Sequence, residues 1–97
     1  MLFRSRAVAD VDVLLLPATP FVAPRRGVEE LAWPSGRTAA LNADMPRFTA
    51  FANVTGLPAL VVPVGLVDGL PVAVQMVAGP QRELELLALG SLLHGRL

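Results

Sequence analysis

Residues 51–79 read FANVTGLPALVVPVGLVDGLPVAVQMVAG and contain the strongest structural signal in the chain. Two apolar runs, Ala59–Val64 and Val72–Val77, flank the pair Asp68-Gly69. An Asp-Gly pair between two hydrophobic runs is a strong local indication of a tight β-hairpin. We therefore predict that the two runs are strands joined by a turn at this pair.

The second of these strands is apolar on both faces. Alternate side chains point to opposite faces of a strand, which puts Val72, Val74 and Met76 on one face and Ala73, Gln75 and Val77 on the other. Strands of this kind belong in the middle of layered structures, where both faces are covered. The rest of the chain offers little material to cover them, so the pattern favours an inner part of a larger fold.

The composition leads to the same expectation. The chain has 97 residues, of which 54% are hydrophobic and 16% are charged, and its mean hydropathy is +0.58. Soluble domains have about 25% charged residues, and a free-standing domain of this size must keep a substantial polar exterior. We expect residues 1–97 to be the C-terminal fragment of a single larger domain, and we expect the isolated chain to self-associate.

Several functional classes are disfavoured by residue types. Eight acidic residues balance eight basic ones, so nothing favours nucleic acid or an acidic membrane surface as a partner. The chain has no Cys and its only His is His94, which excludes thiol chemistry and a His/Cys metal site. Residues 48–67 carry no charge, but glycines and prolines interrupt them as a membrane span. We expect no cofactor, no metal and a cytoplasmic location.

Before the hairpin, the sequence predicts a strand, a loop and a helix. Val11–Leu16 reads VDVLLL, and this unbroken apolar run indicates a buried strand with parallel pairing. Residues 21–42 show no periodicity and are predicted to be a long loop, of the kind that often borders a functional site. A helix is expected over about 44–54, with Asp44 as its N-cap and Gly56 just after its end.

The remaining elements are a hairpin over about 59–77 and a second helix over about 82–94, in which Gly90 should cost about 1 kcal/mol relative to Ala. The resulting order of strands and helices predicts an α/β layer structure with a partial mixed β-sheet and flanking helices.

Three spaced motifs carry a family resemblance. They are Asp12–Pro20 (DVLLLPATP), Thr49–Gly65 (TAFANVTGLPALVVPVG) and Gly69–Gln75 (GLPVAVQ), and their recurring positions are Asn53, Gly56, Pro58, Pro63, Gly65, Gly69, Pro71 and Gln75. In this order and spacing, the motifs resemble the C-terminal part of amidase-signature enzymes. The resemblance extends from about Val11 to Leu93.

This resemblance implies an enzyme with an α/β/α fold that hydrolyses amide (carbon–nitrogen) bonds, or transfers their ammonia, through a Ser–cis-Ser–Lys triad. The chain has no Lys, and its serines Ser5, Ser35 and Ser91 do not lie in a Gly-Ser-Ser context. Ser91 and His94 are close in sequence, but no orienting acid accompanies them. We therefore assign no catalytic residue, and expect activity only with the missing N-terminal part and a small amide substrate.

Pro17, Thr19 and Pro20 are the substrate-pocket candidates, because ligands of open α/β sheets bind beyond the carboxyl ends of strands. The alternative is a rigid turn in which Thr19 bonds its own backbone. We expect Asn53 to cap helix and loop carbonyls, and Gln75 to be a buried, hydrogen-bonded side chain rather than a ligand contact.

Two alternatives to an amidase remain. The glutaminase subunit of amidotransferases within the same family usually has an acidic residue three positions before the equivalent of Thr49, where this chain has Pro46. A different class would be a non-catalytic module that docks on a partner through its apolar sheet face.

Overall fold

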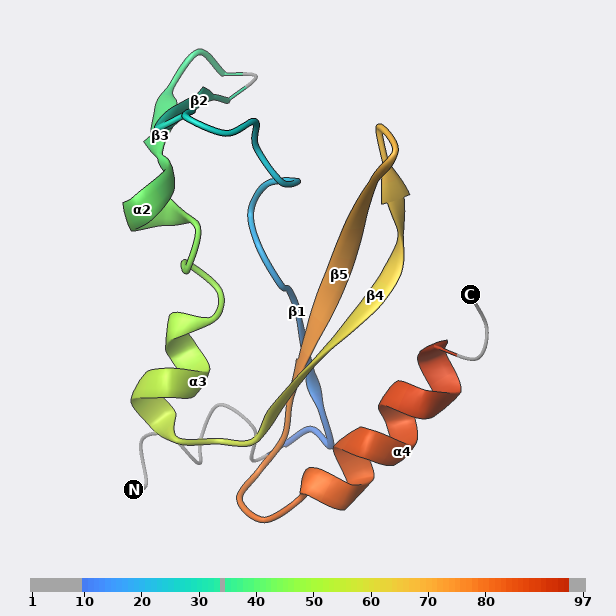
Figure 1. Ribbon diagram of the computed structural model, residues 1–97. Helices are drawn as coiled ribbons and strands as arrows, with labels where there is room; N and C mark the ends of the chain where they lie inside the picture. Colours follow the sequence, from blue (N-terminus) through green and yellow to red (C-terminus); the bar gives the residue numbers. More distant parts are fainter. Residues whose placement is uncertain (1–9, 34, 95–97) are drawn as a thin grey trace.

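The computed structural model describes residues 10–33 and 35–94 (Figure 1). In chain order its elements are β1 (Leu14–Pro17), β2 (Glu30–Ala32), β3 (Thr38–Ala40), α2 (Leu41–Asp44), α3 (Ala50–Thr55), β4 (Ala59–Val67), β5 (Leu70–Val77) and α4 (Glu83–His94).

The strands β4 and β5 form the hairpin at the centre of the molecule. They pair antiparallel, from Ala59 opposite Val77 to Val67 opposite Leu70. Asp68 and Gly69 at the turn have φ angles of 52° and 77°, and positive φ at both central residues is typical of the turns that suit the twist of a hairpin. The register shifts between Pro63 and Gly65, where β4 contains a bulge.

The first strand, β1, joins the other side of β5, which gives the sheet order β1-β5-β4. The prediction of a buried, parallel strand at Val11–Leu16 was wrong in three respects. The strand begins at Leu14, it runs antiparallel to β5, and Leu15 is 63% exposed. The unbroken apolar run reflects two apolar faces rather than pairing direction, because alternate side chains of β1 lie on opposite sides of the sheet.

Residues 21–42, predicted to be a long loop, contain a second small sheet. Here β2 and β3 pair antiparallel, with Glu30 opposite Ala40 and Ala32 opposite Thr38, and α2 follows β3 directly. The missed hairpin has short strands of three residues each, which are too short to show a recognisable alternation.

The helix predicted over 44–54 is two short helices with a turn between them. Asp44 is the last residue of α2 rather than an N-cap, and α3 begins at Ala50 after Thr49. Pro46 follows α2 closely, and proline cannot donate the hydrogen bond that would continue a helix. At the other end of α3, Gly56 has a φ of 70° and its N–H donates to the carbonyl of Ala52 at 2.9 Å.

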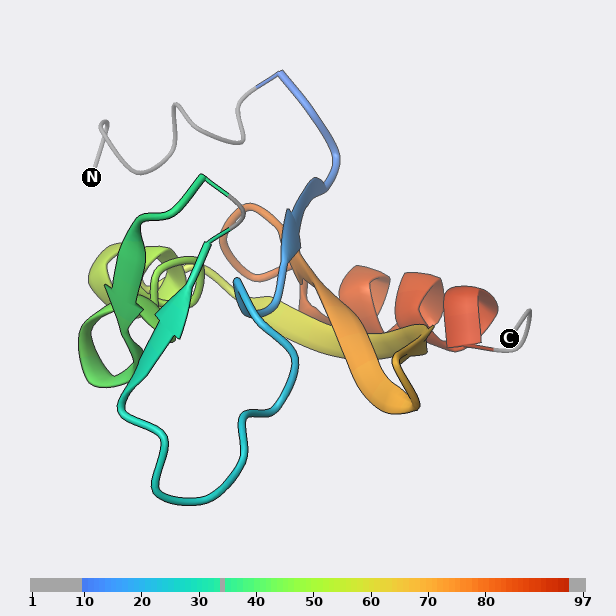
Figure 2. The same cartoon turned by 90° about the horizontal axis from the view of Figure 1, so that it is seen from above.

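The three-stranded sheet lies between α3 and α4 (Figures 1 and 2). Apolar side chains pack on both of its faces. On the α4 side, the buried cluster comprises Val62, Met76, Ala78 and Leu86. On the opposite face, Leu57 and Val77 pack with Leu14, Leu16 and Phe51, the last of which belongs to α3. The two-faced apolar pattern of β5 therefore corresponds to a sheet with a helix on each side.

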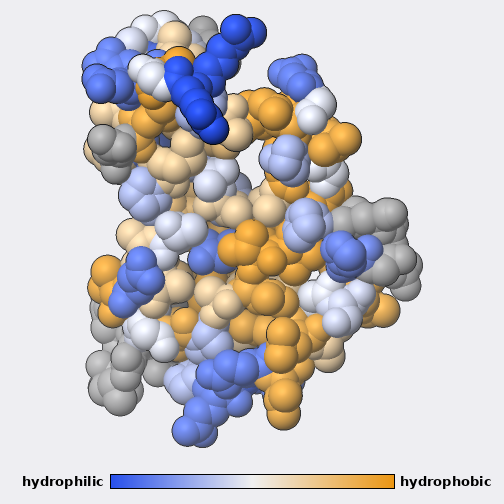
Figure 3. Space-filling model, in the orientation of Figure 1, coloured by the Kyte–Doolittle hydropathy of each residue, from blue (hydrophilic) through white to orange (hydrophobic). Residues whose placement is uncertain are grey.

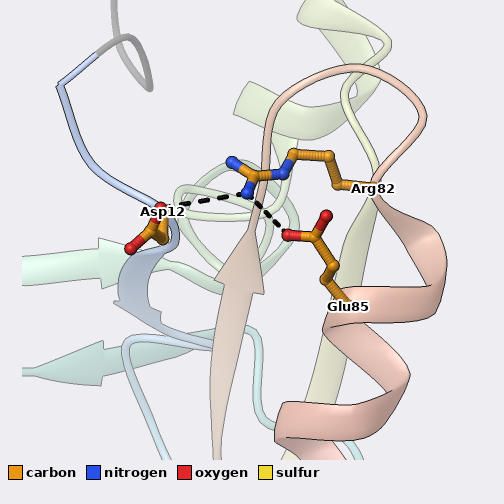
Figure 4. A network of polar contacts seen from close by, with 3 residues as sticks. All are labelled: Asp12, Arg82 and Glu85. Atoms are coloured by element: carbon orange, nitrogen blue, oxygen red, sulfur yellow. Dashed lines mark ion pairs between the residues drawn. The ribbon is translucent and has the colours of Figure 1, made fainter.

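An ion-pair network joins the segment before β1 to the start of α4 (Figure 4). Arg82 Nη2 lies 2.6 Å from Glu85 Oε2 and 3.8 Å from Asp12 Oδ1. The hydrogen bond and charge of Glu85, and then the charge of Asp12, raise the pKa of the Arg82 guanidinium. Arginine is protonated at all ordinary pH values, so Arg82 keeps its positive charge. The network is exposed to solvent and should weaken as the salt concentration rises.

Gly90 lets α4 approach the hairpin closely. It is buried, and a Cβ atom at this position would collide with the Leu60 side chain and lie 3.4 Å from Val62 Cγ2. Replacing Gly90 by Ala therefore trades a gain of about 1 kcal/mol in helix propensity for overpacking that typically costs about 1–3 kcal/mol.

We expect Gly90→Ala to lower the free energy of unfolding, measured by urea denaturation at submicromolar protein concentration. When Leu60→Ala is added, the double variant should lose less free energy of unfolding than the two single variants lose together. The smaller side chain at position 60 makes room for the new methyl group. A more stable Gly90→Ala variant would show that helix propensity dominates over packing at this position.

Candidate functional site

The three pocket candidates lie where the chain leaves the sheet. Pro17 is the last residue of β1, and the N–H of Ala18 continues the pairing by donating to the carbonyl of Ala73 at 3.1 Å. Thr19 is exposed, and its hydroxyl donates to the carbonyl of Phe21 at 2.8 Å. The segment continues into Pro20. It has the geometry of a local turn in which Thr19 bonds the nearby backbone, which was the alternative to a substrate contact. The Thr19 oxygen retains acceptor capacity.

The motif positions shape the backbone at several separate places in the described part of the chain. Gly56 and Gly69 have positive φ at the end of α3 and in the hairpin turn, whereas Pro63 and Gly65 flank the bulge of β4. Pro58 leads into β4 and its carbonyl accepts from the Ala78 N–H at 3.1 Å. Pro71 is the second residue of β5 and lies opposite Leu66.

Gln75 ties the sheet to the turn between α2 and α3. It is 2% exposed, and its Nε2 donates to the carbonyl of Phe48 at 2.8 Å. This matches the expectation of a buried, hydrogen-bonded side chain. Because Phe48 is 27 residues away in sequence, this bond fixes the position of the 45–49 turn relative to β5.

We expect Gln75→Leu to destabilise the fold by about 1–3 kcal/mol, because it leaves the Phe48 carbonyl without its partner while preserving side-chain volume. Urea unfolding followed by far-UV circular dichroism measures the loss. Gln75→Glu is the matched control, since it keeps the shape but replaces the donor by an acceptor. A Gln75→Leu variant as stable as the parent would show that the bond makes no net contribution.

Thr55 performs the capping role that the sequence assigned to Asn53. Its hydroxyl donates to the carbonyl of Phe51 at 2.8 Å and accepts from the N–H of Leu57 at 3.3 Å. The Asn53 side chain is exposed and makes no hydrogen bond within the described ranges. The capping role of Thr55 could have been predicted from the sequence, since Thr55 directly precedes the glycine that ends the helix.

Ser91 and His94 both lie exposed on α4, and neither side chain forms a hydrogen bond with another described residue. Over residues 10–33 and 35–94, no three potential His, Cys, Asp or Glu ligands come together as a metal site. None of the described helices has the length and apolar character needed to cross a bilayer.

An apolar groove of about 360 Å³ opens between β1, β5 and α4. It is lined by Val13, Leu15, Met76, Leu89, Leu92 and Leu93. On the face shown in Figure 3, hydrophobic side chains extend from the hairpin tip through the middle of the molecule, whereas hydrophilic ones gather over β2 and β3. The described part of the chain thus leaves a large apolar surface without a cover.

The fold and this uncovered surface define a part of a layered α/β protein. The family model described as Amidase matches residues 2–87, and the chain belongs to the amidase family. It is 49% identical to an amidase of Pseudomonas putida over an alignment of 70 residues, which covers 67% of this chain and 15% of the relative. It is also 36% identical over 88 residues to a subunit of glutamyl-tRNA(Gln) amidotransferase from Lawsonia intracellularis, covering 86% of this chain and 16% of that protein.

Solved structures agree with the family. The chain matches the crystal structure of an amidase with a TM-score of 0.89 and 35% identity, over 99% of this chain and 22% of the other. The corresponding glutamyl-tRNA(Gln) amidotransferase subunit from Thermotoga maritima matches with a TM-score of 0.63 and 29% identity, over 82% and 16% of the two chains. The chain thus spans 15–22% of the length of these relatives.

Proposed function

We propose that this chain is one part of an enzyme that hydrolyses amide bonds, and that the catalytic serines and lysine of the triad belong to the rest of that enzyme. The observation that carries the proposal is the match of nearly the whole chain to an amidase structure. The sequence contains no Lys, and the family triad requires one. This supports the proposal that the triad belongs to the rest of the enzyme.

Hydrolysis of small amides is favoured over transfer of ammonia to tRNA. Pro46 occupies the place where the resemblance implies an acidic residue in the glutaminase subunits, and the side chain of Asp44 lies 3.8 Å from Arg47 instead. The identity of 36–44% to amidotransferase subunits supports the alternative. It makes glutamine the first amide to include among the test substrates.

We further propose that the remainder of the enzyme covers the apolar groove. Leu15 and Leu92 are 63% and 59% exposed there, and burying apolar surface contributes about 25 cal/mol per Å². A chain that leaves this surface open should associate with other copies of itself.

A chimeric enzyme tests the proposed function. We would replace the segment of the Pseudomonas putida amidase that matches this chain by residues 11–93, and measure ammonia release from aliphatic amides, aryl amides and glutamine. We expect activity within about tenfold of the parent amidase, a loss of no more than about 1.4 kcal/mol in transition-state stabilisation. A folded chimera without activity would contradict the proposal, and activity on glutamine alone would favour the amidotransferase alternative.

In the same chimera, Thr19→Phe should change the preference between small and large acyl groups, because we propose that the 17–20 segment borders the acyl pocket. Thr19 lies at the surface just beyond β1, so a larger side chain can be accommodated without core disruption. The ratio of kcat/KM values for two amides should shift by about tenfold. Thr38→Phe, at an exposed position on β3, is the control. Lower stability with unchanged preference would mean that the segment is only a turn.

A further inference from the structure

A second cavity, separate from the groove and from residues 17–20, lies beside the small β2–β3 sheet. Its volume is about 420 Å³ and it is lined by Trp33, Ser35, Arg37 and Arg47. Three of these residues come from the turn between β2 and β3 and one from the turn after α2. Small-molecule sites in proteins have volumes of about 300–1,000 Å³, so the cavity is large enough for a small organic ligand.

Two backbone hydrogen bonds link described residues of the turn that supplies three of the lining residues. The N–H of Trp33 donates to the carbonyl of Arg37 at 2.6 Å, and the N–H of Gly36 donates to the carbonyl of Trp33 at 2.9 Å. The Trp33 ring is in contact with the ring of Phe21, with their centroids 4.7 Å apart. The indole therefore packs against Phe21 and supplies a flat apolar wall of the cavity, and the backbone of Arg37 is hydrogen-bonded to that of Trp33.

Of the two arginines of the cavity, one has a single ionic partner among the described residues and the other has none. Arg37 makes no ion pair with any described residue. Arg47 has only Asp44 at 3.8 Å, beyond hydrogen-bond distance, and its side chain is 56% exposed. Because both arginines line the same cavity, an anion bound there would face two positively charged groups.

We propose that this cavity binds a small organic carboxylate. The guanidinium fork matches the two oxygens of a carboxylate, the Ser35 hydroxyl adds a donor, and the flat Trp33 wall contacts the carbon skeleton. Inorganic phosphate would use the charges but would gain nothing from the indole. The inference goes beyond the proposed hydrolysis, because it concerns binding at a site away from the 17–20 segment.

Trp33 provides the measurement, because it is the only Trp in the chain and lines the cavity. The purified full chain, at submicromolar concentration, would be titrated with cyclohexanecarboxylate while Trp fluorescence is recorded. Cyclohexanecarboxamide, which lacks the charge, and inorganic phosphate would be titrated in parallel. We expect a saturable change with the carboxylate, at least about tenfold weaker binding of the other two ligands, and weaker carboxylate binding in higher salt.

The variant Arg37→Gln/Arg47→Gln should bind the carboxylate at least about tenfold more weakly, since it loses both charge-assisted contacts. Arg25→Gln/Arg26→Gln removes the same charge from exposed positions outside the cavity and should bind as the parent does. If the double cavity variant loses its circular dichroism spectrum, Arg37→Lys keeps the charge and removes only the planar fork.

Equal binding by the cavity and control variants, equal binding of the amide or phosphate, or no saturable change with the carboxylate would each overturn the assignment. None of these results involves hydrolysis, so they are independent of the chimera experiment.

Discussion

The purified chain should release no ammonia from primary amides above the background of a Ser91→Ala variant. Attack on an amide requires an activated nucleophile with a base in hydrogen-bond reach and oriented donors for the oxyanion. Ser91 and His94 lie exposed on α4, and the chain has no Lys. Compared with an intact enzyme, the isolated chain should lack the whole enzymatic rate acceleration of amide hydrolysis, and in typical enzymes this acceleration is about 10⁶-fold or more.

The assay would use a panel of aliphatic and aryl amides with coupled detection of ammonia. Turnover that survives purification and disappears in Ser91→Ala would show that the described residues hold a catalytic site after all. Turnover that is equal in both proteins would instead come from a contaminating host enzyme.

Self-association at micromolar concentration is the second large effect that we expect. The groove between β1, β5 and α4 exposes apolar leucine side chains to water. Exposed apolar patches of this kind favour association between molecules. Sedimentation velocity should show oligomers whose size rises with concentration, together with binding of a hydrophobic dye.

Leu15→Glu/Leu92→Glu places charges in this groove and should raise the concentration needed for association by at least about tenfold, because buried charges without partners are costly. Leu84→Glu is the matched control, since Leu84 is 82% exposed on the same helix but does not line the groove. A monodisperse monomer that unfolds cooperatively would contradict our proposal that the remainder of an enzyme covers this face. It would favour a stand-alone module instead.

The central hairpin could be predicted because its information is local. The Asp68-Gly69 pair and the two flanking apolar runs are sufficient to indicate strands and turn. The position of Gln75 could also be predicted, because an amide on a strand with two apolar faces must find a buried partner. Which carbonyl it contacts could not, since Phe48 is brought there by the break after α2.

Features that depend on tertiary contacts were inaccessible to sequence reasoning. The orientation of β1 is set by its neighbour β5 and leaves no trace in the apolar run. Helix propensity alone marks Gly90 as a weak point of α4, whereas in the fold it permits contact with Leu60. The residues of the cavity beside Trp33 come from short elements inside a segment predicted to be a loop, so the sequence gives no sign that they meet.

The bulge in β4 has a consequence for the kind of aggregate that the chain can form. The hairpin tip exposes Leu66, Val67 and Leu70, a combination that would favour stacking of strands into fibrils. Pro63 and the register shift after it break the regular row of donors along β4, and fibril growth needs such a row at an exposed edge. Oligomers of this chain should therefore form by side-chain contact and dissociate on dilution, without the cross-β diffraction and the dye response of amyloid.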